Sequence, residues 1–324
     1  MELPGNLGAE HPLEEKLRSS DAYHSLVMEK EVAGVLAHLG WRTIHSCFFM
    51  DPETGKLREV DVVARQLWKK KSRRGDKLVR IHIIVECKSA RDYHLLFSRE
   101  EVEEVRKDMF LRLHAEWIGW ESQNRSRLIA ALSELGVSSR DLLALSEGFS
   151  EWAYPNEVMS VDGLHLEPSD ATLYSSAFRE TNTKNEKDLD SSVLWRAGQS
   201  VLAAVQGFRE EIIKFHLSWM AGAAKSALQA KESVVDKVKW VYSDHARMID
   251  LYHPVVVIES PLWVIEELTL KRVESCRLVR RGQAGTADTW FDVVSRTNLE
   301  AYLSLVSQHY SRLLRRARAR LDQR

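Results

Sequence analysis

The pattern of hydrophobic and polar positions divides the chain into helical and β-rich stretches. Between residues 22 and 39 apolar side chains recur at helical spacing, and the pattern stops at Gly40, which predicts one helix. Three β-rich runs follow at residues 41–49, 57–68 and 78–89, and the turn residues between them predict an antiparallel meander. Helical spacing returns over residues 194–231, where a second long helix is expected.

The hydrophobic pattern after Ser98 predicts an insertion and further strands. After Ser98 helical spacing replaces the two-residue alternation, so we expect a helical insertion over residues 99–193, with an exposed polar loop at 167–192. Apolar runs return at residues 253–260 and 289–295, as strands of a sheet, before a final helix.

These stretches predict an α/β fold with a mixed sheet flanked by helices. We expect an N-terminal arm at residues 1–22, a first core part at 23–98, the insertion at 99–193 and a second core part at 194–324.

Composition narrows the class of protein. Of 324 residues, 44% are hydrophobic and 29% are charged, which is typical of a globular protein and excludes collagen-like or wholly disordered chains. The formal net charge is −1, so any nucleic-acid site must be local.

The cysteines and the start of the chain bear on the compartment. The three cysteines are widely spaced and form no CxxC pair, which fits neither a disulfide framework nor a zinc ribbon. The start of the chain lacks the basic and apolar stretches of a signal peptide, and no apolar run reaches membrane-spanning length. We therefore expect a cytoplasmic protein without membrane association.

Candidate chemistry lies at the end of the third β-rich run. In a strand over residues 78–89, side chains alternate between two faces, so Glu86 and Lys88 share one face about 7 Å apart. A symmetric hairpin would set Asp61, on the preceding run, opposite residues 86–88. Two carboxylates and one ammonium group would then converge.

A divalent cation resolves the repulsion between these carboxylates. Mg²⁺ prefers oxygen ligands, and Asp61, Glu86 and the carbonyl of Cys87 could supply them, with Mn²⁺ as a substitute. Lys88 would hold the attacking water and neutralise charge developing on phosphorus. This arrangement suits phosphodiester hydrolysis.

The same residues resemble the PD-(D/E)xK nuclease superfamily, which has the restriction-endonuclease-like fold and includes Mrr-type and resolvase-like enzymes. The resemblance covers residues 26–98 through the stretches REVDVVA at 58–64 and VECKS at 85–89, and it is weaker over 194–310. It implies Asp61 and Glu86 as metal ligands, Lys88 as the catalytic lysine and Glu31 as an accessory acid. Val60 stands where the name-giving proline would be, and the block at 99–193 has no counterpart in the minimal fold.

The candidate catalytic residues also have non-catalytic interpretations. The tripeptide [DE]xK also occurs at residues 14–16, and a solvated ion pair at a strand end would explain Glu86 and Lys88 without catalysis. Glu29 competes with Glu31 as the acid of the first helix. The motifs of phosphate loops, dinucleotide-binding folds, zinc proteases and serine hydrolases are absent from the sequence.

A basic segment at residues 65–80 surrounds the predicted hairpin turn. Its position predicts contacts with a phosphate backbone, although a solvated turn would explain it too. The residues expected to bind nucleic acid are Lys69, Lys70, Lys71, Arg73 and Arg74. A second cluster over residues 312–320 is either another phosphate-contacting surface or the cationic end of a helix.

The sequence thus predicts a Mg²⁺-dependent endonuclease in restriction, defence or repair. DNA is favoured over RNA by the resemblance alone, and a homo-oligomer is compatible with it. The alternative is an inactive module that keeps the fold and binds nucleic acid or assembles a complex.

Overall fold

The computed structural model describes residues 12–70, 77–89, 93–99, 115–116, 122–152, 173–175, 177–181, 192–245, 248–280 and 289–322. The helices are α1 (Pro12–Arg18), α2 (Asp21–His38), α4 (Ser122–Glu134), α5 (Ser139–Trp152), α6 (Val193–Ala230), α7 (Val234–His245) and α8 (Leu299–Asp322), with a short 3₁₀ helix η4 (Arg296–Asn298). The strands are β1 (Arg42–Met50), β2 (Leu57–Lys70), β3 (Lys77–Lys88), β4 (His94–Ser98), β5 (Ala115–Glu116), β6 (Tyr174–Ser175), β7 (Phe178–Thr181), β8 (Met248–Ile258), β9 (Leu262–Glu266), β10 (Thr269–Val273), β11 (Ser275–Arg280) and β12 (Thr289–Ser295).

The larger sheet is mixed, as the sequence predicts. Its strand order is β1-β2-β3-β8-β12-β11-β6, and β5 also pairs with β8. Strands β1, β2 and β3 form the predicted antiparallel meander, whereas β8 runs parallel to both β3 and β12. A parallel neighbour requires a long crossover connection, and α6 and α7 lie in the chain between β3 and β8.

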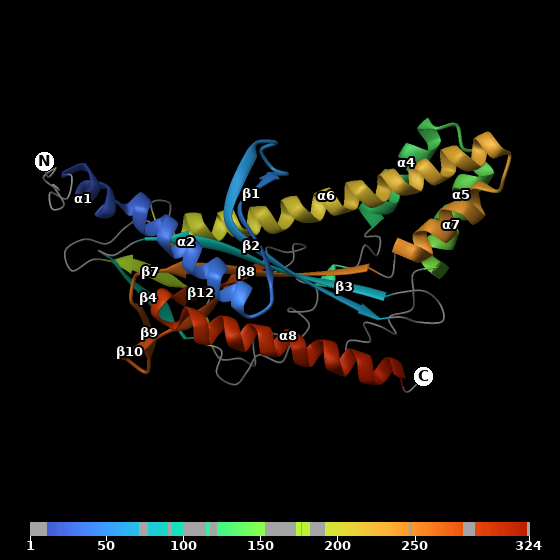
Figure 1. Cartoon of the computed structure of the whole chain (residues 1–324). Coiled ribbons are helices and arrows are strands. Elements are labelled where there is room, and N and C mark those ends of the chain that lie inside the picture. The colour runs from blue at the N-terminus through green and yellow to red at the C-terminus, as the bar shows by residue number, and fades with distance from the viewer. Residues whose placement is uncertain are drawn as a thin grey trace, which may run out of the picture.

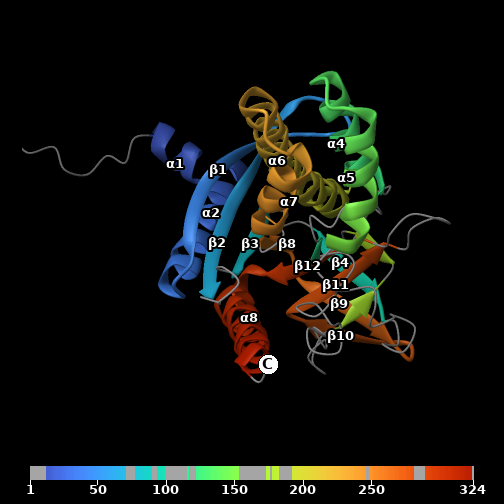
Figure 2. The same cartoon turned by 90° about the vertical axis from the view of Figure 1, so that its right-hand side faces the viewer.

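Helices cover both faces of this sheet (Figures 1 and 2). One core contains α2, α8 and the side chains of β3 that begin with Ile81 and Ile83. The other core lies between the sheet and α6, and includes Ile84 of β3 and Phe208 of α6. The alternation of β3 therefore sends odd-numbered side chains toward α2 and even-numbered ones toward α6.

Helix α2 ends where the sequence predicts. Gly40 has φ of +84°, which glycine adopts at little cost, and its N–H donates to the carbonyl of Ala37. The N–H of Trp41 donates to the carbonyl of Leu36 at 3.0 Å, completing a Schellman motif. Trp41 is buried against Tyr310 of α8, so the helix end also fixes the start of β1.

Helices α4 and α5 lie in the predicted insertion and gather with α7 around the far half of α6 (Figure 1). Their shared core includes Leu128, Leu145, Met220 and Val238. Helices α4 and α5 therefore belong to one core with the crossover helix α6.

A smaller sheet has the order β10-β9-β4-β7, and the loop expected at residues 167–192 is wrong at 174–175 and 178–181, which are strands. Strand β6 joins the larger sheet and β7 pairs with β4. Glu180 of β7 is buried, and it accepts a hydrogen bond of 2.6 Å from Ser192 at the start of α6. A carboxylate is favourable beside a helix N-terminus, so a polar stretch that read as a loop contributes a strand and a cap.

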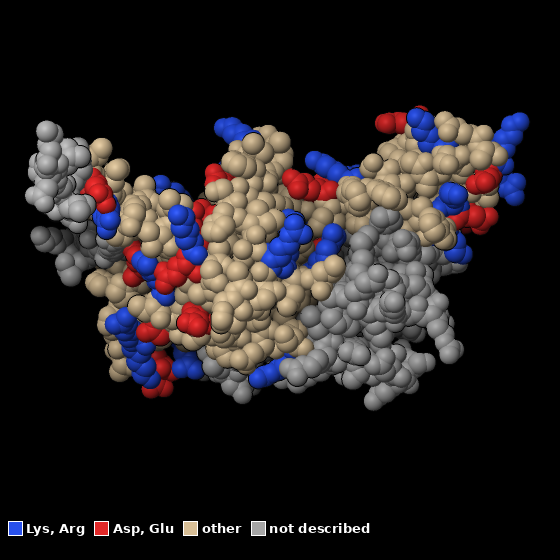
Figure 3. Space-filling view, in the orientation of Figure 1, with Lys and Arg blue, Asp and Glu red and all other residues tan. Residues whose placement is uncertain are grey.

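Among the described residues, no helix combines the length and the apolar character needed to cross a membrane. In the space-filling view, acidic and basic side chains are interspersed over the visible face (Figure 3).

Candidate functional site

Asp61, Glu86 and Lys88 meet at the carboxyl end of β3. The β2–β3 pairing ends with Val62 opposite Val85, one residue short of Asp61 and Glu86. The N–H of Cys87 donates a hydrogen bond of 2.6 Å to Oδ2 of Asp61, and Nζ of Lys88 lies 2.8 Å from Oε1 of Glu86. The hairpin therefore brings the three groups together.

Glu86 is the most perturbed acid of this site. Its side chain is 7% exposed, and burial together with the negative charge of Asp61 raises its pKa to about 7, against the opposing effects of Lys88 and Ser200. The second carboxylate oxygen, Oε2, is buried and has no hydrogen-bond partner within the described part of the chain. An unsatisfied buried oxygen of this kind is costly and calls for a ligand.

The other two groups respond to the same surroundings. Burial raises the pKa of Asp61, although the Cys87 amide and the Lys88 charge oppose the rise. Burial by itself would lower the pKa of Lys88, but Glu86 and then Asp61 raise it above its usual value. Lys88 therefore stays protonated at neutral pH beside two carboxyl groups.

Glu29 is the acid of α2 that faces this site. Burial and the charge of Asp61 raise its pKa, and the charge of Lys88 opposes the rise. Ser25, one helical turn earlier, donates weakly to Oε1 of Glu29 at 3.5 Å and to the carbonyl of Cys87 at 3.4 Å. This face of α2 therefore lies over the end of β3.

Glu31, the residue expected as the accessory acid, points elsewhere. Its Oε2 accepts a hydrogen bond of 2.8 Å from Nε of Arg296, which also pairs with Glu259. Two residues of a helix that are two positions apart lie about 200° apart around its axis, so Glu29 and Glu31 cannot both face Asp61. Of the two candidates, the structure brings Glu29 to the site and not Glu31.

Glu259 and Arg296 border the site, and sequence reasoning missed both. The N–H of Glu259 donates to the carbonyl of Lys88 at 3.3 Å, and Oε2 of Glu259 accepts a hydrogen bond of 2.7 Å from Ser89. The only signal in the sequence was that Glu259 directly follows an apolar strand. Its position beside Lys88 follows from the parallel pairing of β3 with β8, which the sequence did not specify.

The oxygen atoms at the end of β3 supply part of the coordination shell that a hard cation needs. The carboxylates of Asp61 and Glu86, whose pKa values are raised, and the carbonyl of Cys87 are oxygen ligands of the kind Mg²⁺ takes. Within the described ranges, no group of three or more His, Cys, Asp or Glu side chains could hold a metal ion. Any metal here would therefore need water or substrate oxygens to complete its shell.

The basic segment expected to bind nucleic acid is only partly described. Lys71, Arg73 and Arg74 fall outside the described residues, and Lys69 and Lys70 are described only as part of β2. Lys69 lies eight positions after Asp61 along β2, which corresponds to roughly 27 Å. Phosphate contact by the tip stays a prediction, and it would concern a phosphate well away from Asp61.

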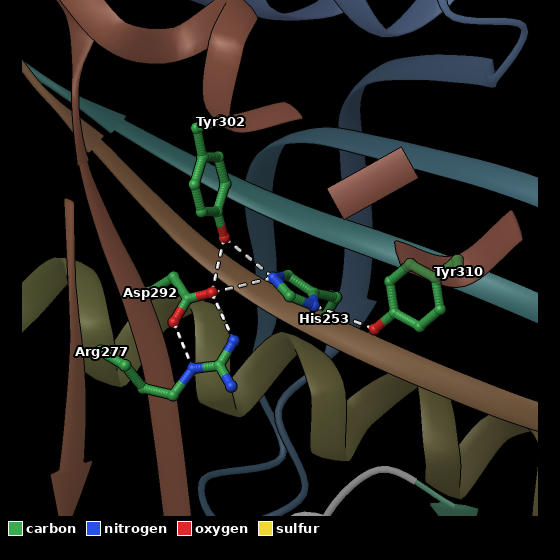
Figure 4. A network of polar contacts seen from close by, with 5 residues as sticks. All are labelled: His253, Arg277, Asp292, Tyr302 and Tyr310. Atoms are coloured by element: carbon green, nitrogen blue, oxygen red, sulfur yellow. Dashed lines mark hydrogen bonds and ion pairs between the residues drawn. The ribbon is translucent and has the colours of Figure 1, made fainter. Parts of the chain in front are cut away.

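A separate buried network holds α8 on the sheet (Figure 4). Arg277 of β11 donates to both oxygens of Asp292 at 2.5 and 2.7 Å, and Tyr302 donates to Oδ2 at 2.6 Å. The ring of His253 lies between Asp292, at 3.0 Å, and the hydroxyl of Tyr310, at 2.9 Å. Because its members are buried and bonded to one another, we interpret this network as structural.

Searches of family models, of curated proteins and of solved structures find no match to this chain. The resemblance to PD-(D/E)xK nucleases therefore stays an expectation from the sequence.

Proposed function

We propose that the protein is a metal-dependent nuclease that hydrolyses phosphodiester bonds, with DNA as the favoured substrate. The observation that carries the proposal is the convergence of Asp61, Glu86 and Lys88 at the end of β3, where Oε2 of Glu86 is buried and has no hydrogen-bond partner among the described residues. Such a cluster is expensive in an ordinary core and is typical of a functional site.

The topology supports the same proposal. A helix, a three-stranded meander, a crossover helix and a parallel fourth strand follow one another as α2, β1 to β3, α6 and β8. This is the order that the resemblance implies, and it leaves the motif at the edge where β3 and β8 end.

The residues divide the chemistry between them. Asp61, Glu86 and the Cys87 carbonyl would hold Mg²⁺, which supplies positive charge to the phosphate and to the water that attacks it. Lys88 is positioned to orient that water, and its ammonium group stabilises negative charge on phosphorus in the transition state. A bond forms between the water oxygen and phosphorus, the phosphorus–oxygen bond to one sugar breaks, and the leaving oxygen takes up a proton.

A cleavage assay tests this proposal. Supercoiled DNA, linear DNA, single strands and RNA are incubated with the protein in Mg²⁺, Mn²⁺ or chelator. We expect metal-dependent cleavage that Asp61→Asn and Glu86→Gln each abolish, whereas Glu53→Gln, in an exposed turn, leaves the rate unchanged. Cleavage at the wild-type rate by either site variant would refute the metal site.

One observation favours the alternative of an inactive module. Oδ2 of Asp61 already binds the Cys87 amide, and Oε1 of Glu86 already binds Lys88, as in a structural ion pair. Calorimetry with Mn²⁺ separates the two proposals. Binding that Glu86→Gln removes supports the nuclease, and no binding by the wild type favours the module.

We place the protein in the cytoplasm, with a nucleic acid as its partner. Cys47, Cys87 and Cys276 are free thiols, which fits a reducing compartment. Oxidation of the purified protein should therefore create no stabilising disulfide, as measured by thermal unfolding with and without reductant.

A further inference from the structure

A second polar cluster lies on the α6 face of the larger sheet. Its members on the sheet are Arg65 of β2, Arg80 and His82 of β3, and Asp250 of β8. Arg80 donates to Oδ2 of Asp250 at 2.7 Å, and Nε2 of His82 lies 2.8 Å from Oδ1. Arg65 is directly opposite His82 in the β2–β3 pairing.

Helix α6 contributes contacts to this cluster. The guanidinium of Arg65 lies over the ring of Phe208, 5.8 Å from its centroid. Arg209, the next residue of α6, interacts electrostatically with Tyr252, whose ring stacks on His82 at a centroid distance of 4.9 Å. Three guanidinium groups from three elements thus surround one pair of stacked rings.

The cluster carries more positive than negative charge. Burial, with Arg65 and Arg80 nearby, lowers the pKa of His82 despite its contact with Asp250, so the imidazole is neutral at pH 7. Among the described residues, Asp250 is then the single carboxylate bonded to the cluster's sheet residues. Glu210 also interacts with Arg209, but its carboxylate pairs with Arg127 of α4 at 3.2 Å.

Two guanidinium donors of this cluster are unsatisfied: Nε of Arg65 and Nε of Arg80 are buried and have no hydrogen-bond partner among the described residues. In the neutral ring of His82, Nε2–H donates to Asp250, so Nδ1 is an acceptor and adds no donor. The Arg80 side chain is nevertheless 34% exposed, so a ligand can reach its guanidinium. Buried unsatisfied donors on cations are costly, and an oxyanion is the ligand that satisfies them.

The cluster is separate from the carboxylate site. Glu86 lies four positions after His82 along β3, which corresponds to roughly 13 Å. Along α6, Ser200 interacts with Glu86 and Arg209 lies at the cluster, and nine helical residues also span about 13 Å. Both measures place the cluster beyond the reach of a phosphate held at Glu86.

We propose that Arg65, Arg80 and Arg209 form a binding site for a phosphate group. Guanidinium groups present paired N–H donors that match phosphate oxygens. The phosphate belongs either to a nucleic-acid backbone or to a free nucleotide, because both present the same oxyanion.

Two binding measurements in an Asp61→Asn background distinguish these sources. The first is a salt titration of affinity for a labelled single-stranded oligonucleotide, and the second is calorimetry with ADP. If the ligand is a backbone phosphate, Arg65→Gln flattens the dependence of log affinity on log salt by about 0.7. If it is a free nucleotide, that slope is unchanged and Arg65→Gln weakens ADP binding about tenfold, as expected for one lost charge-assisted hydrogen bond.

The controls keep the proposal falsifiable. Arg65→Lys keeps the charge and should retain most of the salt slope. Arg140→Gln replaces an exposed residue of α5 and should change neither the salt slope nor the ADP affinity. Arg80→Gln provides a second test, with thermal unfolding to confirm the fold. If Arg80→Gln fails to fold, Arg65→Gln alone decides. An unchanged salt slope together with an unchanged ADP affinity in the folded variants would overturn the site. This result does not depend on the cleavage assay, because both experiments measure binding in the Asp61→Asn background.

Discussion

The backbone N–H of Cys87 donates a hydrogen bond of 2.6 Å to the carboxylate of Asp61, across the point where the β2–β3 ladder ends. A side chain here takes the place of the next ladder carbonyl. The bond holds the Asp61 carboxylate beside Glu86, so a structural contact and a candidate ligand position come from one residue.

This bond predicts different effects for two substitutions of Asp61. Asn keeps an acceptor oxygen for the Cys87 N–H and removes a charge that repels Glu86, so Asp61→Asn should be at least as stable as the wild type at pH 7. Asp61→Ala leaves the amide unpaired and should lose about 1–3 kcal/mol. Urea unfolding of both variants measures the difference, and equal stabilities would show that the bond contributes nothing.

The raised pKa of Glu86 makes stability depend on pH when divalent metal is absent. Between the unfolded pKa of about 4.5 and the folded value of about 7, the folded state binds more protons, so stability falls as pH rises. Glu86→Gln cannot ionise and should exceed the wild type by roughly 1–3 kcal/mol at pH 8, with the gain lost below about pH 4.5. Urea unfolding from pH 4 to pH 8 in chelator checks this, and a gain independent of pH would contradict it.

Lys88→Ala should reduce turnover by about 10²- to 10³-fold, because the ammonium acts on charge that develops in the transition state. Metal affinity should change far less, since Lys88 supplies no ligand oxygen. Single-turnover cleavage measures the rate, and Mn²⁺ calorimetry measures the metal affinity. Lys56→Ala, in the exposed β1–β2 turn, is the control. An equal loss of both would identify Lys88 as a structural ion-pair partner.

Glu29 and Glu31 provide a matched pair on one helix. Glu29→Gln should lower the cleavage rate at least tenfold, because Glu29 shares the electrostatic surroundings of Asp61 and Lys88. Glu31→Gln weakens a partly exposed contact with Arg296 and should change the rate less than threefold. The reverse order in the same assay would restore Glu31 as the accessory acid.

Substitution of Asp292 in the buried network under α8 should cause a large loss of stability. Asp292→Asn removes the charge that two donors of Arg277 and the Tyr302 hydroxyl bind, and should cost about 3–5 kcal/mol. The pKa of Asp292 lies well below its usual value, because Arg277 and His253 outweigh the effect of burial. Its contribution is therefore present above the unfolded pKa of about 3.9 and is lost as pH falls further. Tyr310→Phe should cost only about 1 kcal/mol, and urea unfolding at pH 7 and pH 3 tests both.

Local patterns in the sequence determined the parts of the site that one hairpin contains. Strand alternation placed Glu86 and Lys88 on one face, and the pairing of β2 with β3 brought Asp61 to the end of the ladder, where it bonds the Cys87 amide. The limits of α2 followed from apolar spacing and from Gly40. These features need only neighbouring residues, so a single sequence contains the information.

Contacts between distant segments were decided by the tertiary structure alone. Glu29 rather than Glu31 reaches the site because the packing of α2 on the sheet fixes its rotation, and periodicity does not specify that angle to within one residue. Glu259 comes to Lys88 through a parallel strand that follows a long crossover, and Glu180 comes to the start of α6 through the short strand β7. Polar residues whose partners are distant in the chain look like solvated loop residues in the sequence, because the burial that gives them their roles exists only once the segments have packed together.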